Sequence, residues 1–100
     1  MAVTALLDLQ LKPDSLEKAH ATLRAILAET RAFPGCVEVT VLVDSRDPAH
    51  VVVHETWESI ESDKAYRVWR TTPEGAGAAE LGSVLDGRPK LTKFTVAEGV

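Results

Sequence analysis

Apolar and polar residues alternate along four stretches of this chain, and each alternation predicts a β-strand. Residues 3–11 place apolar side chains at every second position, which is the period of a strand that buries one face. The same period recurs over residues 36–43 and 51–57, which are rich in valine and separated by a short polar turn, so they should form an antiparallel hairpin. Residues 90–97 end the pattern as a fourth strand.

Between these strands the spacing of apolar residues changes to three and four, which predicts helices. The first helix should cover residues 15–32, with Asp14 and Glu17 capping its start and the Pro34-Gly35 pair ending it. Its apolar stripe consists of Leu16, Ala19, Leu23, Ile26, Leu27 and Thr30.

A second, shorter helix is expected over residues 61–70, and Thr72 is then the expected cap of a further short helix. The inward residues expected of the 61–70 helix are Ala65, Val68 and Trp69. The helix after Thr72 contains three glycines. Each costs about 1 kcal/mol relative to alanine, so we expect this helix to be loose.

The order β-α-β-β-α-α-β is that of a split β-α-β unit, in which helices cover one face of a four-stranded antiparallel sheet. We therefore expect an α+β protein of ferredoxin-like fold, formed by residues 1–100 as a single domain. The other sheet face is too apolar for water and too polar for a dry core, which predicts a homodimer joined sheet to sheet. The side chains expected on that face are Thr4, Leu6, Asp8, Glu38, Thr40, Leu42, Val52, His54, Thr56, Lys93 and Thr95.

Composition and charge narrow the range of functions. Apolar residues make up 45% and charged residues 26% of the chain, as in ordinary globular domains. The net charge is -4 with both signs interspersed, so no basic stripe is available for nucleic acid or an anionic membrane. The apolar N-terminal stretch is too short to span a membrane and lacks the basic start of a signal peptide, so we expect a cytoplasmic protein.

Metal and cofactor signals are missing from the sequence. Cys36 is the single cysteine, which excludes an internal disulfide and a thiolate metal cluster within one chain. No histidine or carboxylate spacing is typical of a metal site, and no glycine-rich loop indicates a phosphate-bearing cofactor. We therefore expect neither a metal nor a cofactor.

The third strand departs from ordinary alternation. Its apolar face carries Glu55 between Val53 and Trp57, so a carboxylate should lie buried beneath the helices. A buried carboxylate must be hydrogen-bonded, paired with a cation, or raised in pKa. Two interpretations stay open. Glu55 pairs with Arg67, Arg70 or a helix amide and orients the helix, or it lines a pocket and accepts a proton.

Two short motifs add a resemblance to a known family. Phe33-Pro34-Gly35-Cys36 and, after the hairpin, Glu55-Thr56-Trp57-Glu58-Ser59 resemble the signature of the antibiotic biosynthesis monooxygenase-like family, and the likeness covers nearly the whole chain. The resemblance implies the dimeric α+β barrel, in agreement with the sheet-to-sheet homodimer. It also implies oxygenases of quinols, polyketide phenols and anthrones that use neither metal nor flavin. In these enzymes the deprotonated substrate itself reduces O2, so the protein supplies a base, an apolar pocket and exclusion of water.

The resemblance also indicates candidate site residues. Trp57 corresponds to the family's pocket tryptophan and Glu55 to its strand glutamate, whereas Tyr66 stands where many members carry a histidine. That replacement removes the most obvious base, although a tyrosine can still donate a hydrogen bond to a phenolate or peroxide oxygen. Asp63 stands where the family has a large apolar side chain, so the helix register is expected to differ.

Aromatic side chains on the second helix would complete a substrate slot. Tyr66 and Trp69 lie three residues apart and can share one helix face. Together with Trp57 and Val53 they would form a flat slot for a fused-ring compound. The alternative is that these rings only fill the core.

The leading hypothesis is a cofactor-independent oxygenase that acts on a small aromatic, quinol or polyketide-type compound, with Glu55 or His20 moving the proton. His20 lies within the apolar stripe of the first helix, where a hydrogen-bonded core histidine is the alternative. The main rival function is a dimeric binding module that holds a hydrophobic metabolite without converting it. An isomerase acting on a small carbonyl compound is also compatible with the fold, whereas haem degradation is disfavoured because the chain contains no asparagine.

Overall fold

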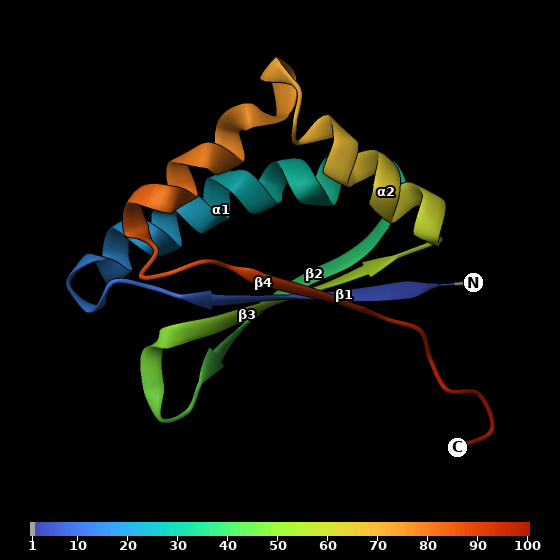
Figure 1. Ribbon diagram of the computed structural model, residues 1–100, viewed down its shortest axis with the longest axis horizontal. Helices are drawn as coiled ribbons and strands as arrows, with labels where there is room; N and C mark the ends of the chain where they lie inside the picture. Colours follow the sequence, from blue (N-terminus) through green and yellow to red (C-terminus); the bar gives the residue numbers. More distant parts are fainter. Residues whose placement is uncertain (1) are drawn as a thin grey trace.

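The computed structural model describes residues 2–100 and shows a twisted sheet with helices on one face only (Figure 1). The strands are antiparallel and lie in the order β2-β3-β1-β4, so β1 and β3 form the centre of the sheet. The elements along the chain are β1 (Val3–Gln10), η1 (Pro13–Ser15), α1 (Leu16–Ala32), β2 (Cys36–Asp44), β3 (Asp47–Trp57), α2 (Ile60–Trp69), η2 (Pro73–Val84) and β4 (Lys90–Phe94). This arrangement confirms the predicted ferredoxin-like α+β fold.

The main core lies between the sheet and the long helix α1. Strand β3 alternates strictly, so that every second side chain from Ala49 to Trp57 is buried. The stripe predicted for α1 is confirmed, because the helix buries Ala19, Leu23, Ile26 and Leu27 in the core with the strands, and Thr30 is buried next to α2. None of the helices in residues 2–100 is long and apolar enough to span a membrane.

The turn from α1 into β2 depends on a glycine. Gly35 has a φ of 89°, a conformation that side-chain-bearing residues rarely adopt. A Cβ at this position would lie 2.3 Å from Oγ of Ser62, so the turn packs directly against α2. The start of α1 differs from the prediction. Pro13–Ser15 form a 3₁₀ turn, and Ser15, which precedes the helix, makes no side-chain capping bond.

The short helix α2 is rotated relative to the prediction. Asp63 and Tyr66 are its buried residues, whereas Ala65 and Val68, which were expected to face inward, are exposed. The apolar pattern was misleading because a carboxylate occupies an inward position and is neutralised there by two cations, as described below. Residues 73–84 form the 3₁₀ helix η2 rather than an α-helix.

The 3₁₀ geometry of η2 explains which of its residues are buried. Three residues per turn place Gly75, Ala78, Leu81 and Val84 on one line. Leu81, Val84 and Gly75 are buried along this line, and Figure 1 shows η2 running beside α1 on the helical layer. A Cβ on Gly75 would lie 2.1 Å from a backbone oxygen of α2, so the start of η2 has room only for glycine.

The closing strand has the opposite phase to the prediction. Lys93 pairs with Ala5 and Phe94 pairs with Thr4, so Lys93 points to the helical side and Phe94 to the open sheet face. Thr95 follows the end of β4. Phe94 was expected inward because it is large and apolar. The phase is reversed because the amine of Lys93 pairs with a buried carboxylate under α2.

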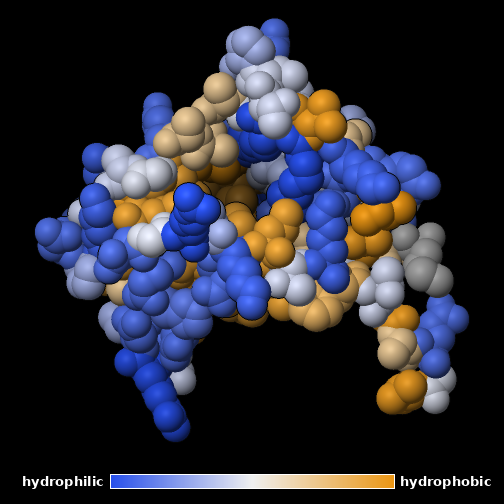
Figure 2. Space-filling view, in the orientation of Figure 1, coloured by the Kyte–Doolittle hydropathy of each residue, from blue (hydrophilic) through white to orange (hydrophobic). Residues whose placement is uncertain are grey.

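The sheet face without helices, here called the open face, mixes apolar and polar side chains. Leu42 is 49% exposed and Phe94 is 48% exposed. Figure 2 shows apolar residues at the surface among hydrophilic ones, notably between the two layers and in the C-terminal tail. The side chains of the open face are Thr4, Leu6, Asp8, Gln10, Glu38, Thr40, Leu42, His50, Val52, His54, Thr56, Lys90, Thr92 and Phe94.

Candidate functional site

Glu55 is buried on the helical side of β3, as predicted, with only 2% of its surface exposed. Its Oε1 accepts hydrogen bonds from Nε1 of Trp57 at 3.0 Å and from an Nη of Arg67 at 2.7 Å. Trp57 reaches it because residues two apart on a strand share a face. The carboxylate is therefore ionically paired beneath α2, which is the first of the two interpretations that the sequence left open.

The Glu55–Arg67 pair belongs to a larger charge network. Arg67 also contacts Oδ1 of Asp63, through Nε at 3.2 Å and an Nη at 3.0 Å. The other oxygen of Asp63, which is fully buried, pairs with the amine of Lys93 on β4. Two carboxylates and two cations thus alternate across β3, α2 and β4, which offsets the cost of burying each charge.

Tyr66 is buried one turn after Asp63, with its hydroxyl against α1. The Oη atom lies 2.7 Å from Oγ1 of Thr30 and accepts a hydrogen bond from Nε of Arg70 at 2.7 Å. The guanidinium carbons of Arg67 and Arg70 lie 5.0 and 5.1 Å from the centre of its ring. With 3% of its surface exposed, the tyrosine is enclosed by protein groups.

Arg70 joins three elements, a role that sequence reasoning missed. Besides Tyr66 it donates to the carbonyl oxygen of Ile26 at 3.0 Å and to that of Gly75 at 3.3 Å, and it pairs with Glu29 at 3.1 Å. These bonds tie the end of α2 to α1 and to the start of η2. No sequence pattern signals the link to α1, because Ile26 and Glu29 lie 44 and 41 residues away along the chain.

The four aromatic rings near Glu55 pack against one another. The ring centres of Trp57 and Tyr66 are 4.9 Å apart, and those of Tyr66 and Trp69 are 6.2 Å apart. Phe33 packs edge-on against two of them, 5.4 Å from Tyr66 and 6.1 Å from Trp57. Trp57 is fully buried, so the slot expected between these residues is filled by their own rings.

Val53 lies apart from the aromatic cluster. It is fully buried in the aliphatic core with Val51, Leu23 and Leu27, and it is not in the group formed by Trp57 and Tyr66. Of the predicted site residues, the structure thus brings together Glu55, Trp57, Tyr66 and Trp69.

His20 lies elsewhere and is exposed, so its expected place in the apolar stripe of α1 is wrong. The stripe passes through Ala19 and Leu23, and His20 points to the side of it. Thr30, the partner of Tyr66, is ten residues further along α1, which is about 15 Å. His20 and the Glu55 cluster therefore belong to different parts of the molecule.

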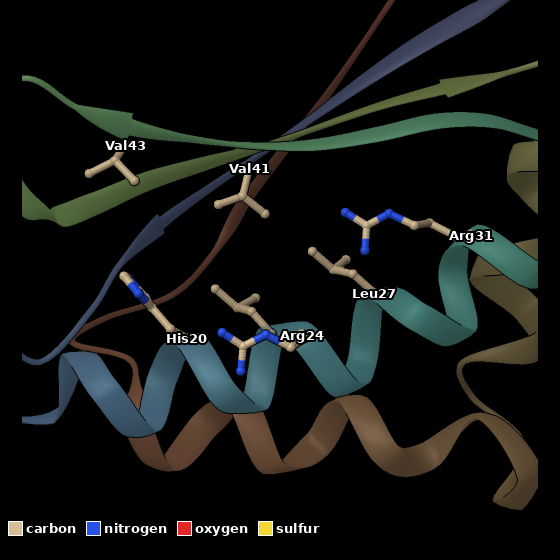
Figure 3. A pocket seen from close by; sticks show the side chains of 7 residues that line it. His20, Arg24, Leu27, Arg31, Val41 and Val43 are labelled. Carbon is tan, nitrogen blue, oxygen red and sulfur yellow. The ribbon is translucent and has the colours of Figure 1, made fainter.

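His20 instead stands at one end of a hollow between α1 and the edge strand β2, which we call the α1–β2 hollow (Figure 3). The hollow has a volume of about 410 Å³. Its walls are apolar, and its polar groups are all basic, namely His20, Arg24 and Arg31. The lining residues are His20, Leu23, Arg24, Leu27, Arg31, Val41 and Val43.

Sequence reasoning missed the two arginines of this hollow. Arg24 and Arg31 are seven residues apart and so lie on one side of α1, a spacing that could have indicated a basic edge beside the apolar stripe. Arg31 also donates to the carbonyl oxygen of Val39 at 3.1 Å, which holds its guanidinium over β2.

Cys36 and possible metal ligands add no further site. Burial, and next the negative charge of Glu55, raise the pKa of the Cys36 thiol, so the reactive thiolate is disfavoured there. Within residues 2–100, no three histidine, cysteine or carboxylate side chains are placed to hold a metal ion.

Comparisons with known proteins agree with the fold and with the family that the two motifs resemble. A sequence model of the family described as antibiotic biosynthesis monooxygenase matches residues 2–80. No curated protein sequence matched the chain. Solved structures do resemble it, and three of them illustrate the likeness.

Rv0793 from Mycobacterium tuberculosis has a TM-score of 0.80 and 20% identity, with all of both chains covered. A conserved protein from Methanosarcina mazei Go1 has a TM-score of 0.81 and 18% identity, over 94% of this chain and 91% of that one. A structure described as antibiotic biosynthesis monooxygenase has a TM-score of 0.80 and 17% identity, over 95% and 98%. These likenesses concern the fold, whereas the sequence match spans most of the chain, and the protein therefore belongs to the antibiotic biosynthesis monooxygenase family.

Proposed function

We propose that this protein is a cofactor-independent oxygenase of a small aromatic, quinol or polyketide-type compound, and that the α1–β2 hollow receives the substrate. Family membership supports an oxygenase-like reaction. We choose this site because the aromatic cluster and the α1–β2 hollow differ in the space they offer a substrate. The aromatic slot at Trp57 is closed, whereas the α1–β2 hollow is open, apolar and flanked by a histidine.

In the proposed reaction His20 takes a proton from the substrate and leaves an electron-rich anion. The guanidinium group of Arg24, one helical turn after His20 beside the hollow, stabilises that anion. The anion gives electrons to O2 and a carbon–oxygen bond forms, so that a proton from His20 completes a hydroperoxide. Loss of water then leaves a carbonyl group. A ring CH2 thereby becomes C=O, one oxygen atom of O2 is retained, and the other leaves as water.

Glu55 and Tyr66 fit this proposal as framework residues. Glu55 is fixed by Arg67 of α2 and Tyr66 by Arg70, which directly follows α2, and both are closed to solvent. The catalytic roles predicted for them, and the substrate-binding roles predicted for Trp57, Trp69 and Val53, would require the aromatic cluster to open. The location of the chemistry is therefore tested by comparing a His20 variant with a Glu55 variant.

An oxygen electrode with a panel of quinols and anthrones tests the proposal. We expect O2 uptake in the presence of the protein, and His20→Gln should lower kcat by about 100-fold, the usual contribution of a general base. Lys18→Gln, an exposed change on the same helix outside the hollow, should leave kcat unchanged. Activity that survives His20→Gln but is lost in Glu55→Gln would place the reaction at the aromatic cluster instead.

The second candidate function is a module that binds a hydrophobic metabolite without converting it. The observation that favours it is the exposure of His20, because an exposed imidazole lacks the water-excluded surroundings that help proton transfer. A ligand that binds in the hollow while no O2 is consumed across the panel would favour this module over the oxygenase.

We further propose that the protein is a homodimer joined through its open faces. Leu42 and Phe94 are about half exposed there, next to half-buried Leu6 and Val52. Light scattering should give twice 10.8 kDa. Leu42→Asp should shift this value toward the monomer, whereas Val68→Asp, which changes a valine of α2 that is 65% exposed, should not. A wild-type mass of 10.8 kDa at micromolar concentration would exclude the dimer.

A further inference from the structure

The α1–β2 hollow has a chemical character that the family match does not assign. Four of its seven lining residues are aliphatic, the other three are basic, and none is acidic. The chain as a whole carries a net charge of -4. Two guanidinium groups on an acidic protein, beside an apolar hollow of about 410 Å³, are suited to an apolar molecule with a negative end.

The two arginines of the hollow differ from the arginines of the aromatic cluster. Arg67 and Arg70 are each paired with carboxylates of this chain. Arg24 and Arg31 have no carboxylate within 4.0 Å among residues 2–100, so their guanidinium groups keep donors for a ligand.

Arg31 is also held in place. Its single bond to the carbonyl oxygen of Val39 fixes the guanidinium above β2 and leaves most of its five N–H donors unused. In Figure 3 its side chain extends back along α1 toward Leu27 and Val41, while His20 extends toward β2 near Val43. A cation that is already positioned pays less entropy when it binds an anion.

We propose that the α1–β2 hollow binds a fused-ring aromatic carboxylate, with the carboxylate on Arg31 and the rings on the aliphatic wall. The carboxylate follows from the two arginines, because a guanidinium fork matches the two oxygens of a carboxylate. The rings rest on the proposed function, in which an electron-rich ring system supplies the electrons for O2. Arg24 and Arg31 lie about 10.5 Å apart along the helix axis, so a ligand longer than one ring fits between them.

Calorimetry under nitrogen tests the inference with the intact protein, because binding is then measured without turnover. The probes are 1-hydroxy-2-naphthoate and 1-naphthol, which share the ring system and differ in the carboxylate. We expect the naphthoate to bind at least about tenfold more tightly, the effect of one charge-assisted hydrogen-bonded pair. Its Kd should rise with salt concentration, whereas that of naphthol should change little.

Variants connect the effect to the hollow. Arg31→Gln should weaken naphthoate binding about tenfold or more and leave naphthol binding within about twofold. Val43→Glu, which adds a carboxylate at a lining position that is 52% exposed, should also weaken naphthoate binding. Arg88→Gln, an exposed arginine that does not line the hollow, is the matched control and should bind like the wild type.

Equal affinity for the two probes, no binding of the naphthoate, or wild-type affinity in Arg31→Gln would each overturn the inference. Thermal melts of each variant show that loss of binding is not loss of folding. The oxygen assay reports separately on the proposed function. Naphthoate binding without O2 uptake would support the carboxylate site and refute the proposed oxygenase activity. O2 uptake with neutral quinols and no preference for carboxylates would support the oxygenase activity and refute the carboxylate site.

Discussion

Replacing Glu55 with glutamine tests whether this buried carboxylate holds the fold together or performs chemistry. Glutamine keeps the size and the acceptor oxygen, so Trp57 can still donate its indole N–H. The change removes the charge that Arg67 contacts at 2.7 Å. Arg67 is not left alone, because Asp63 still pairs with it at 3.0 Å.

The expected loss of stability in Glu55→Gln follows from the contact between Arg67 and Asp63 that remains. A buried charge left without any partner costs about 3–5 kcal/mol. Loss of one hydrogen bond to a charged group costs about 1.5–3 kcal/mol, and this is the relevant case here because Asp63 remains. We therefore expect Glu55→Gln to lower the free energy of unfolding by about 2 kcal/mol. For a domain of 100 residues this corresponds to a fall in Tm of about 8–16 °C.

Thermal and urea denaturation of the wild type, Glu55→Gln and Glu58→Gln measure this effect. Glu58 is exposed and directly follows β3, so its replacement controls for the loss of one negative charge and should shift Tm by less than about 2 °C. If Glu55→Gln leaves Tm unchanged but lowers kcat by about 100-fold, the structural assignment is refuted and Glu55 is the base.

Three further predictions concern other parts of the fold. Gly75→Ala should lower Tm by several degrees because its Cβ would lie 2.1 Å from a backbone oxygen of α2, whereas Gly82→Ala, with nothing within 4 Å, should leave Tm unchanged or raise it. Tyr66→Phe should lower the free energy of unfolding in urea by about 1–3 kcal/mol, since two partners at 2.7 Å lose their hydroxyl; a midpoint equal to the wild type would contradict this. Hydrogen bonds to Asp44, and then to a second carboxylate, raise the pKa of His50 from 6.5, so its stabilisation is complete below about pH 6.5 and is lost as the pH rises through the raised pKa. The Tm difference between wild type and His50→Gln should therefore be largest in mildly acid buffer and shrink toward alkaline pH, and a difference independent of pH would show that the imidazole charge contributes nothing.

Strand and helix order could be predicted from the sequence because it depends on periodicity alone. The valine-rich strands and the α1 stripe repeat at two and at three to four residues, and burial follows that repeat wherever the inward side chains are apolar. The pattern was misleading at α2 and β4. There the inward positions hold Asp63, which is stable in the interior because Arg67 and Lys93 neutralise it, and Lys93, which turns toward that carboxylate. A pairing between residues 30 positions apart leaves no local signal.

The candidate site was predictable in part for the same reason. Glu55, Trp57, Tyr66 and Trp69 meet because β3 and α2 are adjacent in the chain and each supplies residues on one face. Whether their rings leave space depends on side-chain packing, which includes Phe33 from the preceding turn. The α1–β2 hollow depends on how far α1 lies from the edge strand, a distance that no residue pattern encodes.

The 3₁₀ geometry of η2 has a consequence for how the protein moves. Bonds between residues three apart are less well aligned than those of an α-helix, and η2 contains three glycines from Gly75 to Gly82. It packs against α1 and forms no strand of the sheet, and at its end Ser83 and Val84 accept hydrogen bonds from Lys12. Such a segment can detach as a unit at a free energy below that of global unfolding. Amide hydrogens of residues 73–84 should therefore exchange with solvent sooner than those of β1 and β3, and a protease would first cut the chain there while the sheet stays intact.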